Sequence, residues 1–402
     1  MIPVAEAVGI VLGQAGTPGA ERVALDAAAG RVLAEDVFAD TDLPPFDRAQ
    51  MDGYAVRSAD LRETPARLRV VGEAAAGSGW RGRVGPGEAV RIMTGAPLPA
   101  GADSVQQVEL TRELEDGALV EVERATAPGQ FYVPRASEIT KGERVLEAGE
   151  EINAARSAVL ASFGYAEVPV GRRPRVAVLA TGTELVPVGE RPGQDQIRDS
   201  NSYSLAAYAR LAGAEVERLP FAGDDPELLR REVGAAAARS DVLVLSGGVS
   251  MGRYDFTKAA LHALGAEVFF ERVALRPGKP TVFARLPGGA LVFGLPGNPV
   301  SVSVTFHLFA RTALRRMQGA RDAAPAEERA VLSRPLKGAA GRASYLPAAL
   351  KTDADGRLLA EPLKWGGSSD FVAFARATAL VVVPAGEEFD AGAVVGVVRL
   401  PG

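Results

Sequence analysis

Three glycine-bearing stretches of the sequence could hold an anion. They are TGTEL (181–185), SGGVSMG (246–252) and GLPGNPVS (294–301), and each directly follows a short apolar run. Glycine lets the backbone turn its amides outward, and a helix that begins at such a turn attracts phosphate through free amides and its dipole. One stretch alone is better explained as a tight turn between a strand and a helix. Three at one edge of a sheet favour a shared binding site.

Carboxylates lie in or close to the same stretches. Glu184 belongs to the first, Asp255 follows the second, and Asp224 lies between the two. Each could simply cap or charge the first turn of a helix. As a set they suit ligands of Mg²⁺, directly or through water, beside a phosphate. A cation between the glycine turn and Asp255 would also explain why an acid follows an anion-binding turn.

Basic and small polar residues complete the chemistry. ERVALRPGKP (271–280) contains Arg272, Arg276 and Lys279, which suit a polyanion, although a solvated strand edge would have the same composition. Nearer the N-terminus, MDGYAV and RIMTGAPLP place Asp52 and Thr94 in turns. Composition alone explains those two as ordinary turn residues.

Several classes of site and of protein are excluded by what the chain contains. With no cysteine and two histidines, it cannot form disulfides, thiolate metal sites, iron–sulfur clusters or a histidine-rich zinc site. Any metal would be a hard cation bound by oxygen, for which Mg²⁺ is the natural candidate. The net charge of −5 argues against a strongly basic nucleic-acid binder. MIPVAEAVGIVLGQAG lacks the basic region of a signal peptide and no apolar run approaches a membrane span, so we expect a cytoplasmic protein.

Strands alternating with helices are predicted between residues 171 and 322. The apolar runs in RPRVAVLATGTEL, EVERLPFAGDD and DVLVLSGGVS are typical of buried strands that end in loops. Helices are predicted in NSYSLAAYARLAGAEV, capped by Asn201 or Ser202, in PELLRREVGAAAARS, in DFTKAALHALG and in VSVTFHLFARTALRRM. This alternation predicts a mostly parallel sheet with helices on both faces, which binds ligands at the carboxyl ends of its strands.

The flanking regions are richer in β-structure. A chain of 402 residues with 45 glycines and 27 prolines is too long for one ordinary domain and contains many turns. Short runs between 68 and 122 predict a small β-domain, and ALVVVPAG and AVVGVVRL predict a C-terminal β-domain or barrel. The segment up to residue 170 could pack back on the N-terminal helix as one discontinuous domain.

Together, the motifs resemble those of one known family. PPFDRAQMDGYAVR, RIMTGAPLPAGAD, ATGTEL, LSGGVSMGRYDFTK, RPGKP and GLPGNPVS stand in the order found in the molybdopterin molybdenumtransferases, which include the C-terminal domain of gephyrin. The resemblance implies a multidomain α/β plus β protein. Its domains would be an elongated discontinuous linker (1–43 and 135–170), a small β-domain (44–134), a mostly parallel α/β/α molybdopterin-binding domain (171–322) and a C-terminal β-barrel (323–402).

The resemblance also implies an activity. The family inserts molybdate into adenylylated molybdopterin and releases AMP with the help of Mg²⁺, as a homodimer whose cleft is shared between subunits. A molybdopterin adenylyltransferase would be the upstream partner; neither nucleic acid nor a membrane is expected as one. The missing cysteines fit this activity, because the sulfurs that take molybdenum belong to the dithiolene of the substrate. A non-catalytic molybdopterin-binding scaffold, a paralogue that prefers tungstate and a phosphate-binding regulator stay open as alternatives.

Site residues carry over motif by motif. By this resemblance Asp52 and Thr94 are catalytic and come from the partner subunit, and Glu184, Asp224 and Asp255 are catalytic and surround the metal. The expected substrate-binding residues are Thr181, Gly182, Ser246, Gly247, Gly248, Ser250, Arg272, Arg276, Lys279, Pro296, Asn298 and Pro299. The sequence departs from the family pattern at residues 48–50 and 129–139 and at Pro347, which concerns the linker and barrel domains more than the central site.

Overall fold

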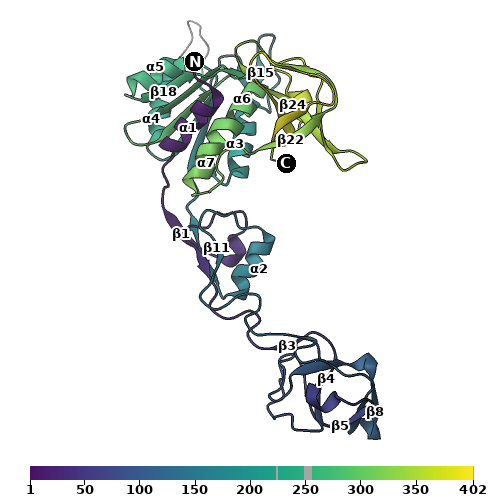
Figure 1. The fold of residues 1–402 in the computed structure, drawn as a ribbon. Helices are drawn as coiled ribbons and strands as arrows, with labels where there is room; N and C mark the ends of the chain where they lie inside the picture. Colours follow the sequence, from purple (N-terminus) through teal and green to yellow (C-terminus); the bar gives the residue numbers. More distant parts are fainter. Residues whose placement is uncertain (223–224, 249–255, 402) are drawn as a thin grey trace. The chain divides into compact units, whose positions relative to one another are not determined.

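The computed structural model describes residues 1–222, 225–248 and 256–401 (Figure 1). The chain divides into two compact units. Unit 1 comprises Met1–Glu35, Ala148–Ser157 and Ala166–Gly402, and unit 2 comprises Asp36–Glu147 and Ala158–Tyr165. The finer division into four domains stays a prediction.

A six-stranded sheet forms the centre of unit 1. Its strands, in spatial order, are β16 (Glu215–Arg218), β13 (Arg175–Ala180), β17 (Val242–Ser246), β21 (Leu291–Leu295), β20 (Pro280–Arg285) and β18 (Glu267–Arg272). The strands from β16 to β21 run parallel, and β20 is antiparallel to both of its neighbours. The predicted mostly parallel sheet is therefore confirmed.

Helices cover both faces of this sheet, as predicted. Along β13, Val176 and Val178 belong to one apolar cluster and Ala177 and Leu179 to another, because successive side chains of a strand point to opposite faces. The second cluster includes residues of α4 (Pro226–Ala237) and α5 (Phe256–Ala263). The first includes residues of α1 (Val4–Gln14), α3 (Asn201–Leu211), α6 (Pro299–Thr305) and α7 (Arg311–Met317), with a π-helical turn at Phe306–Ala310 that makes α6 and α7 continuous.

The N-terminal helix packs differently from the prediction. Val4, Ala7 and Val11 of α1 are buried in the cluster that also holds Leu314 of α7, so α1 belongs to the sheet and not to the returning segment. That segment instead pairs through β12 (Glu167–Gly171) with β1 (Ala20–Ala24) in an antiparallel ladder. The apolar spacing of α1 predicted the helix but not its neighbour.

The C-terminal region closes into a barrel, as predicted. Its strands are β22 (Glu327–Leu332), β24 (Ala343–Thr352), β25 (Leu358–Pro362), β26 (Ala379–Val383) and β28 (Val394–Arg399), and pairing of β24 with β26 closes the ring. The short strand β19 (Leu275–Arg276) pairs in parallel with the start of β24. A short helix, α8 (Phe371–Phe374), connects β25 to β26.

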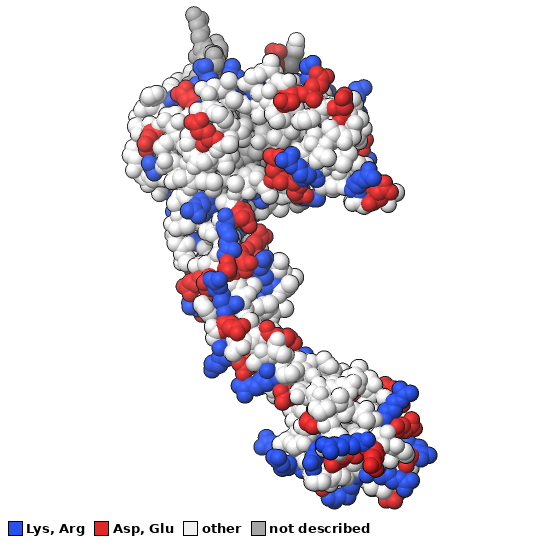
Figure 2. Space-filling model, viewed as in Figure 1, with Lys and Arg blue, Asp and Glu red and all other residues white. Residues whose placement is uncertain are grey.

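Unit 2 contains the predicted small β-domain. Its six-stranded sheet has the order β7 (Ser104–Gln107), β4 (Gly53–Val56), β6 (Glu88–Ile92), β5 (Ala66–Ala74), β9 (Leu119–Val122) and β8 (Thr111–Leu114). Tyr54 and Ala55 of β4 enter separate apolar clusters on its two faces. The surface carries basic and acidic side chains side by side (Figure 2), including the pair Arg67–Glu121 at 2.9 Å.

The remaining elements are short. They are β2 (Val37–Phe38) paired with β11 (Arg144–Leu146), β3 (Arg48–Ala49) with β10 (Tyr132–Val133), β14 (Leu185–Val186) with β15 (Ile197–Arg198), β23 (Leu336–Lys337) with β27 (Glu388–Phe389), and the helix α2 (Ala154–Ser162). Within the described part of the chain, no helix is long and apolar enough to cross a membrane.

Candidate active site

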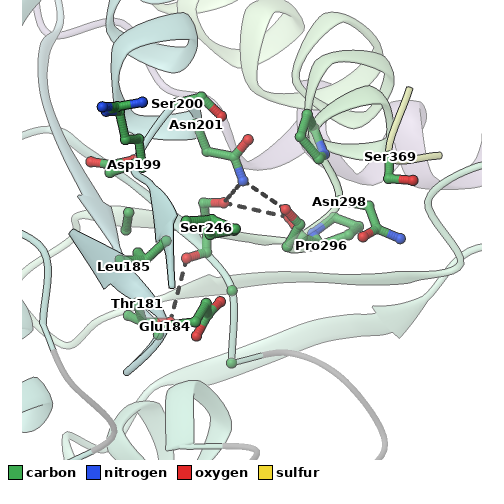
Figure 3. A pocket seen from close by; sticks show the side chains of 18 of the residues that line it. Thr181, Glu184, Leu185, Asp199, Ser200, Asn201, Ser246, Pro296, Asn298 and Ser369 are labelled. Carbon is green, nitrogen blue, oxygen red and sulfur yellow. Dashed lines mark hydrogen bonds between the residues drawn. The ribbon is translucent and has the colours of Figure 1, made fainter. Parts of the chain in front are cut away.

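A cavity of about 920 Å³ opens at the carboxyl ends of β13, β17 and β21 (Figure 3). The three glycine-bearing stretches meet here, as the parallel sheet requires. The predicted site residues that line it are Thr181, Gly182, Glu184, Ser246, Gly247, Gly248, Pro296, Asn298 and Pro299. Ser250, Asp224 and Asp255 lie outside the described residues.

Two glycines give the loop after β17 its shape. Gly247 has φ +94° and Gly248 has φ +65°, a conformation that side chains with a Cβ rarely adopt. A Cβ at Gly247 would lie 2.4 Å from the Thr181 carbonyl oxygen, so the chain passes too close for any other residue. The Gly247 amide donates to the Leu295 carbonyl at 3.2 Å. Gly247 therefore contributes to the site by letting its loop pass close to Thr181. It does not offer its amide to a ligand, because that amide already donates to the Leu295 carbonyl.

Asn201, at the start of α3, connects two of the loops. Its Nδ2 donates to Ser246 Oγ at 2.9 Å and to the Gly297 carbonyl at 2.7 Å, as Figure 3 shows. The prediction that Asn201 or Ser202 caps α3 is wrong. The N-cap position is occupied by Ser200, whose side chain makes no capping hydrogen bond, and the preceding Asp199 instead accepts from the Ser202 amide through Oδ1 at 3.0 Å. Asn201 is thereby left to face the cavity, which it lines.

Glu184 is the predicted metal ligand that the structure describes. Its side chain is exposed in the cavity, and no ion pair involves it within the described ranges. Groups of three acidic or histidine side chains are also absent among the described residues, so the full predicted metal site is not tested. The oxygen ligands that line the cavity include the Glu184 carboxylate and the hydroxyls of Thr181 and Ser246, which are hard ligands and fit Mg²⁺.

A smaller cavity of about 380 Å³ adjoins the first and shares Pro280, Pro296 and Asn298 with it. It contains positive charge, because its lining includes Arg276, Lys279 and Arg342 and no acidic side chain. None of the three cations forms an ion pair with a residue that the structure describes. Other lining residues are Ser301, Trp365 and Ser368. The arrangement suits a small oxyanion.

Arg272 stands apart from these cations. It is exposed at the end of β18 and lines neither of the two cavities described here. Its predicted contact with substrate stays a prediction.

Asp52 and Thr94 lie in unit 2 and contact each other. Asp52 Oδ1 accepts from the Thr94 amide and from Thr94 Oγ1, each at 2.7 Å. The hydrogen bond from the amide and then that from the hydroxyl hold the pKa of Asp52 below its ordinary value. Asp52 is therefore ionised at neutral pH, with one oxygen fixed and the other not engaged by Thr94.

Comparison with known proteins covers nearly the whole chain. Three family descriptions match in order: MoeA N-terminal region (domain I and II) at 2–164, probable molybdopterin binding domain at 177–316, and MoeA C-terminal region (domain IV) at 329–400. A Staphylococcus aureus protein named molybdopterin molybdenumtransferase is 36% identical over 99% of this chain and 95% of its own. The chain belongs to the molybdopterin molybdenumtransferase family. A Bacillus subtilis member is 37% identical over 96% of this chain and 90% of its own.

Solved structures of molybdopterin biosynthesis proteins have the same fold. A crystal structure of the moeA protein from Pyrococcus horikoshii matches all of both chains, with a TM-score of 0.83 and 34% identity. Another crystal structure of a molybdopterin biosynthesis moeA protein, from Pyrococcus horikoshii OT3, matches all of both chains with a TM-score of 0.86 and 28% identity. The multidomain α/β plus β fold expected of a molybdenumtransferase is thus confirmed.

Sequence reasoning did not identify several residues that line the cavities of this molybdenumtransferase, Asn201, Arg342, Trp365 and Phe371 among them. Asn201 was interpreted as a helix cap, although an amide before a helix can equally face a ligand. Arg342, Trp365 and Phe371 come from the C-terminal region, and no local spacing relates them to the glycine loops. The basic residue Arg342 in GRASYLPA was the available signal in the sequence, whereas Pro347 of the same stretch pairs with Leu380 in the barrel.

Replacing Asn201 by alanine is expected to raise the KM for the pterin substrate about tenfold, as loss of a residue that orients a ligand contact commonly does. Ser246 Oγ and the Gly297 carbonyl would both lose their donor. Asn201→Asp should be at least as harmful, because a carboxylate oxygen would face the Gly297 carbonyl. Steady-state kinetics measure the effect. Ser204→Ala, which removes a hydrogen bond to the Asn201 carbonyl on the same helix, is the matched control; equal KM values for the two alanine variants would refute the role.

Proposed function

We propose that the protein transfers molybdenum from molybdate to adenylylated molybdopterin, giving molybdenum cofactor and AMP. The observation that carries this proposal is the pair of adjoining cavities. The larger has the glycine loops and an acidic side chain, as an adenylylated pterin with its pyrophosphate needs. The smaller has three cations that form no ion pair with any described residue, as a tetrahedral dianion needs. Their shared wall would bring the two substrates together.

The chain's own residues contribute position and charge. The turn at Gly247 and Gly248 and the hydroxyl of Ser246, held by Asn201, would receive the phosphate end of the pterin substrate. Molybdate would be held next to it by Arg276, Lys279 and Arg342. The two reacting groups would then be positioned before reaction, which lowers the entropy cost of bringing them together. No soft protein ligand is required, because the dithiolene sulfurs of the substrate accept the molybdenum.

Mg²⁺ would be held by Glu184, with Asp224 and Asp255 as the other proposed ligands. When bound, it neutralises charge on the pyrophosphate whose cleavage releases AMP. The described oxygen donors support this assignment by their chemistry.

The assembly of the enzyme is part of the proposal. We propose a cytoplasmic homodimer in which Asp52 and Thr94 would be contributed by the partner subunit, with a molybdopterin adenylyltransferase supplying the substrate. The ionised state of Asp52 and its hydrogen bonds to Thr94 support a role at a metal-assisted reaction.

The decisive experiment measures AMP release from adenylylated molybdopterin, with molybdate and tungstate titrated separately. Lys279→Ala is expected to raise the molybdate concentration for half-maximal rate by about tenfold or more, since a hydrogen bond to a charged group contributes about 1.5–3 kcal/mol. Lys337→Ala, which removes a lysine paired with Glu388 and outside both cavities, should have no such effect.

Other outcomes would overturn the proposal in different ways. Tight pterin binding without AMP release would favour a scaffold. Phosphate binding with no response to the pterin would favour a regulator, and activity with tungstate alone would identify a paralogue with a different metal.

A further inference from the structure

The C-terminal region supplies one wall of the larger cavity. Residues 366–370 precede α8, and Ser369 of this segment and Phe371, the first residue of α8, line the cavity. The Ser368 carbonyl accepts from the Val300 amide at 3.0 Å, and Asn298 Nδ2 donates to Ser368 Oγ at 2.8 Å. Both donors lie at the start of α6, so this wall is fastened to the glycine loop after β21.

The backbone of the same wall is held by hydrogen bonds to the Asp370 side chain. Asp370 Oδ2 accepts from the Gly366 amide at 2.8 Å, and its Oδ1 accepts from the Ala373 amide at 3.1 Å. The Asp370 carboxylate is thus engaged by the turn and by the first turn of α8. Phe371 follows directly, so its backbone is held in place before any ligand arrives, which lowers the entropy lost on binding.

Phe371 is a half-exposed aromatic ring that lines the larger cavity. Its exposed fraction is 51%, and it is the one aromatic side chain among the described residues that line this cavity. Small or polar groups such as Thr181, Ser246 and Gly248 also line the cavity. A flat ring that enters the cavity can cover the phenyl face and remove apolar surface from water.

We propose that Phe371 stacks on a nitrogen-rich bicyclic ring of the substrate and so positions it in the larger cavity. The cavity, at about 920 Å³, is near the upper end of the range for small-molecule sites and has room for such a ring beside a phosphate chain. Adenylylated molybdopterin has two rings of this chemistry, the pterin and the adenine. The inference rests on the proposed function and adds a positioning residue to it.

Substitutions at Phe371 test the stacking. Phe371→Ala is expected to raise the KM for adenylylated molybdopterin about tenfold or more, with kcat retained, as loss of ring stacking on a base does. Phe371→Tyr should retain the wild-type KM. Phe371→Leu keeps apolar bulk without an aromatic face and should resemble the alanine variant; a wild-type KM for Phe371→Leu would overturn stacking. Val372→Ala is the control, because Val372 is 64% exposed, adjacent in sequence and not among the lining residues.

Binding of neopterin and of AMP, each as a single probe, identifies the ring. A stacked pterin loses fluorescence, so wild-type protein should quench neopterin and Phe371→Ala should not, if the pterin is the partner. Weakened AMP binding in Phe371→Ala would instead identify the adenine, and unchanged binding of both probes would overturn the proposal. AMP release by the wild-type protein is measured in parallel. Its absence refutes the proposed function, whereas normal release with an unchanged KM in Phe371→Ala refutes only the stacking.

Discussion

Replacing Gly247 by alanine is expected to lower kcat/KM for AMP release by about a hundredfold, the penalty typical of displacing reacting groups by about 1 Å. The new Cβ would lie 2.4 Å from the Thr181 carbonyl oxygen, and that oxygen belongs to backbone that cannot rotate away. The φ of +94° adds strain for any residue with a Cβ. Both loops would have to move, and with them the hydroxyl of Ser246. Initial rates of AMP release over a range of substrate concentrations measure the loss.

Gly288→Ala is the matched control for this experiment. Gly288 follows β20 in a turn, and a Cβ there meets no atom within 4 Å. Both variants should remain folded by circular dichroism. A Gly247→Ala enzyme with wild-type kcat/KM would show that the close approach of the two loops does not matter for substrate binding.

Replacing Glu184 by glutamine is expected to lower kcat by about a hundredfold or more, the range in which a carboxylate at a reacting centre commonly acts. The amide keeps the shape of the side chain but removes the negative charge that a hard cation requires. Because Glu184 is exposed in the cavity and unpaired within the described ranges, no fold contact is lost with the charge. Mg²⁺ titration of the AMP-release rate should show a higher half-saturating concentration in the variant.

Removal of Mg²⁺ with a chelator should silence the wild-type enzyme, and added Mg²⁺ should restore it. Glu190→Gln provides the control, since Glu190 is exposed in the same connecting segment and does not line the cavity. An unchanged Mg²⁺ dependence in Glu184→Gln would remove Glu184 from the metal site.

The sequence predicted those features that depend on short-range pattern. Buried runs that end in glycine located β13, β17 and β21, and parallel pairing then placed Thr181, Ser246 and Pro296 at one edge. Alternating runs likewise predicted the small β-domain and the barrel.

Features that depend on long-range packing were not predictable in the same way. The spacing of the apolar residues in α1 predicts that the helix has an apolar face, but it does not predict that this face packs against α7. Arg342 and Phe371 reach the two cavities only because the barrel packs on the start of α6 and on β19. The predicted capping role of Asn201 was wrong because a polar residue at a helix start can either cap the helix or face a ligand. The free amide of Ser202 is already bound by Asp199.

Because β19 pairs with β24, the barrel contributes residues to the smaller cavity. Arg276 belongs to β19 and lies opposite Ser344, next to the turn that carries Arg342. Both the sheet region and the barrel therefore line the smaller cavity. The sheet region contributes Lys279, and the barrel contributes Arg342. If the proposed function is correct, a protein with the sheet region alone would keep the residues proposed to bind the pterin substrate and would lack Arg342, one of the three cations proposed to bind molybdate. We therefore expect from the proposed function that pterin binding and metal insertion depend on different parts of the chain, and that only metal insertion requires the barrel to pack against the sheet.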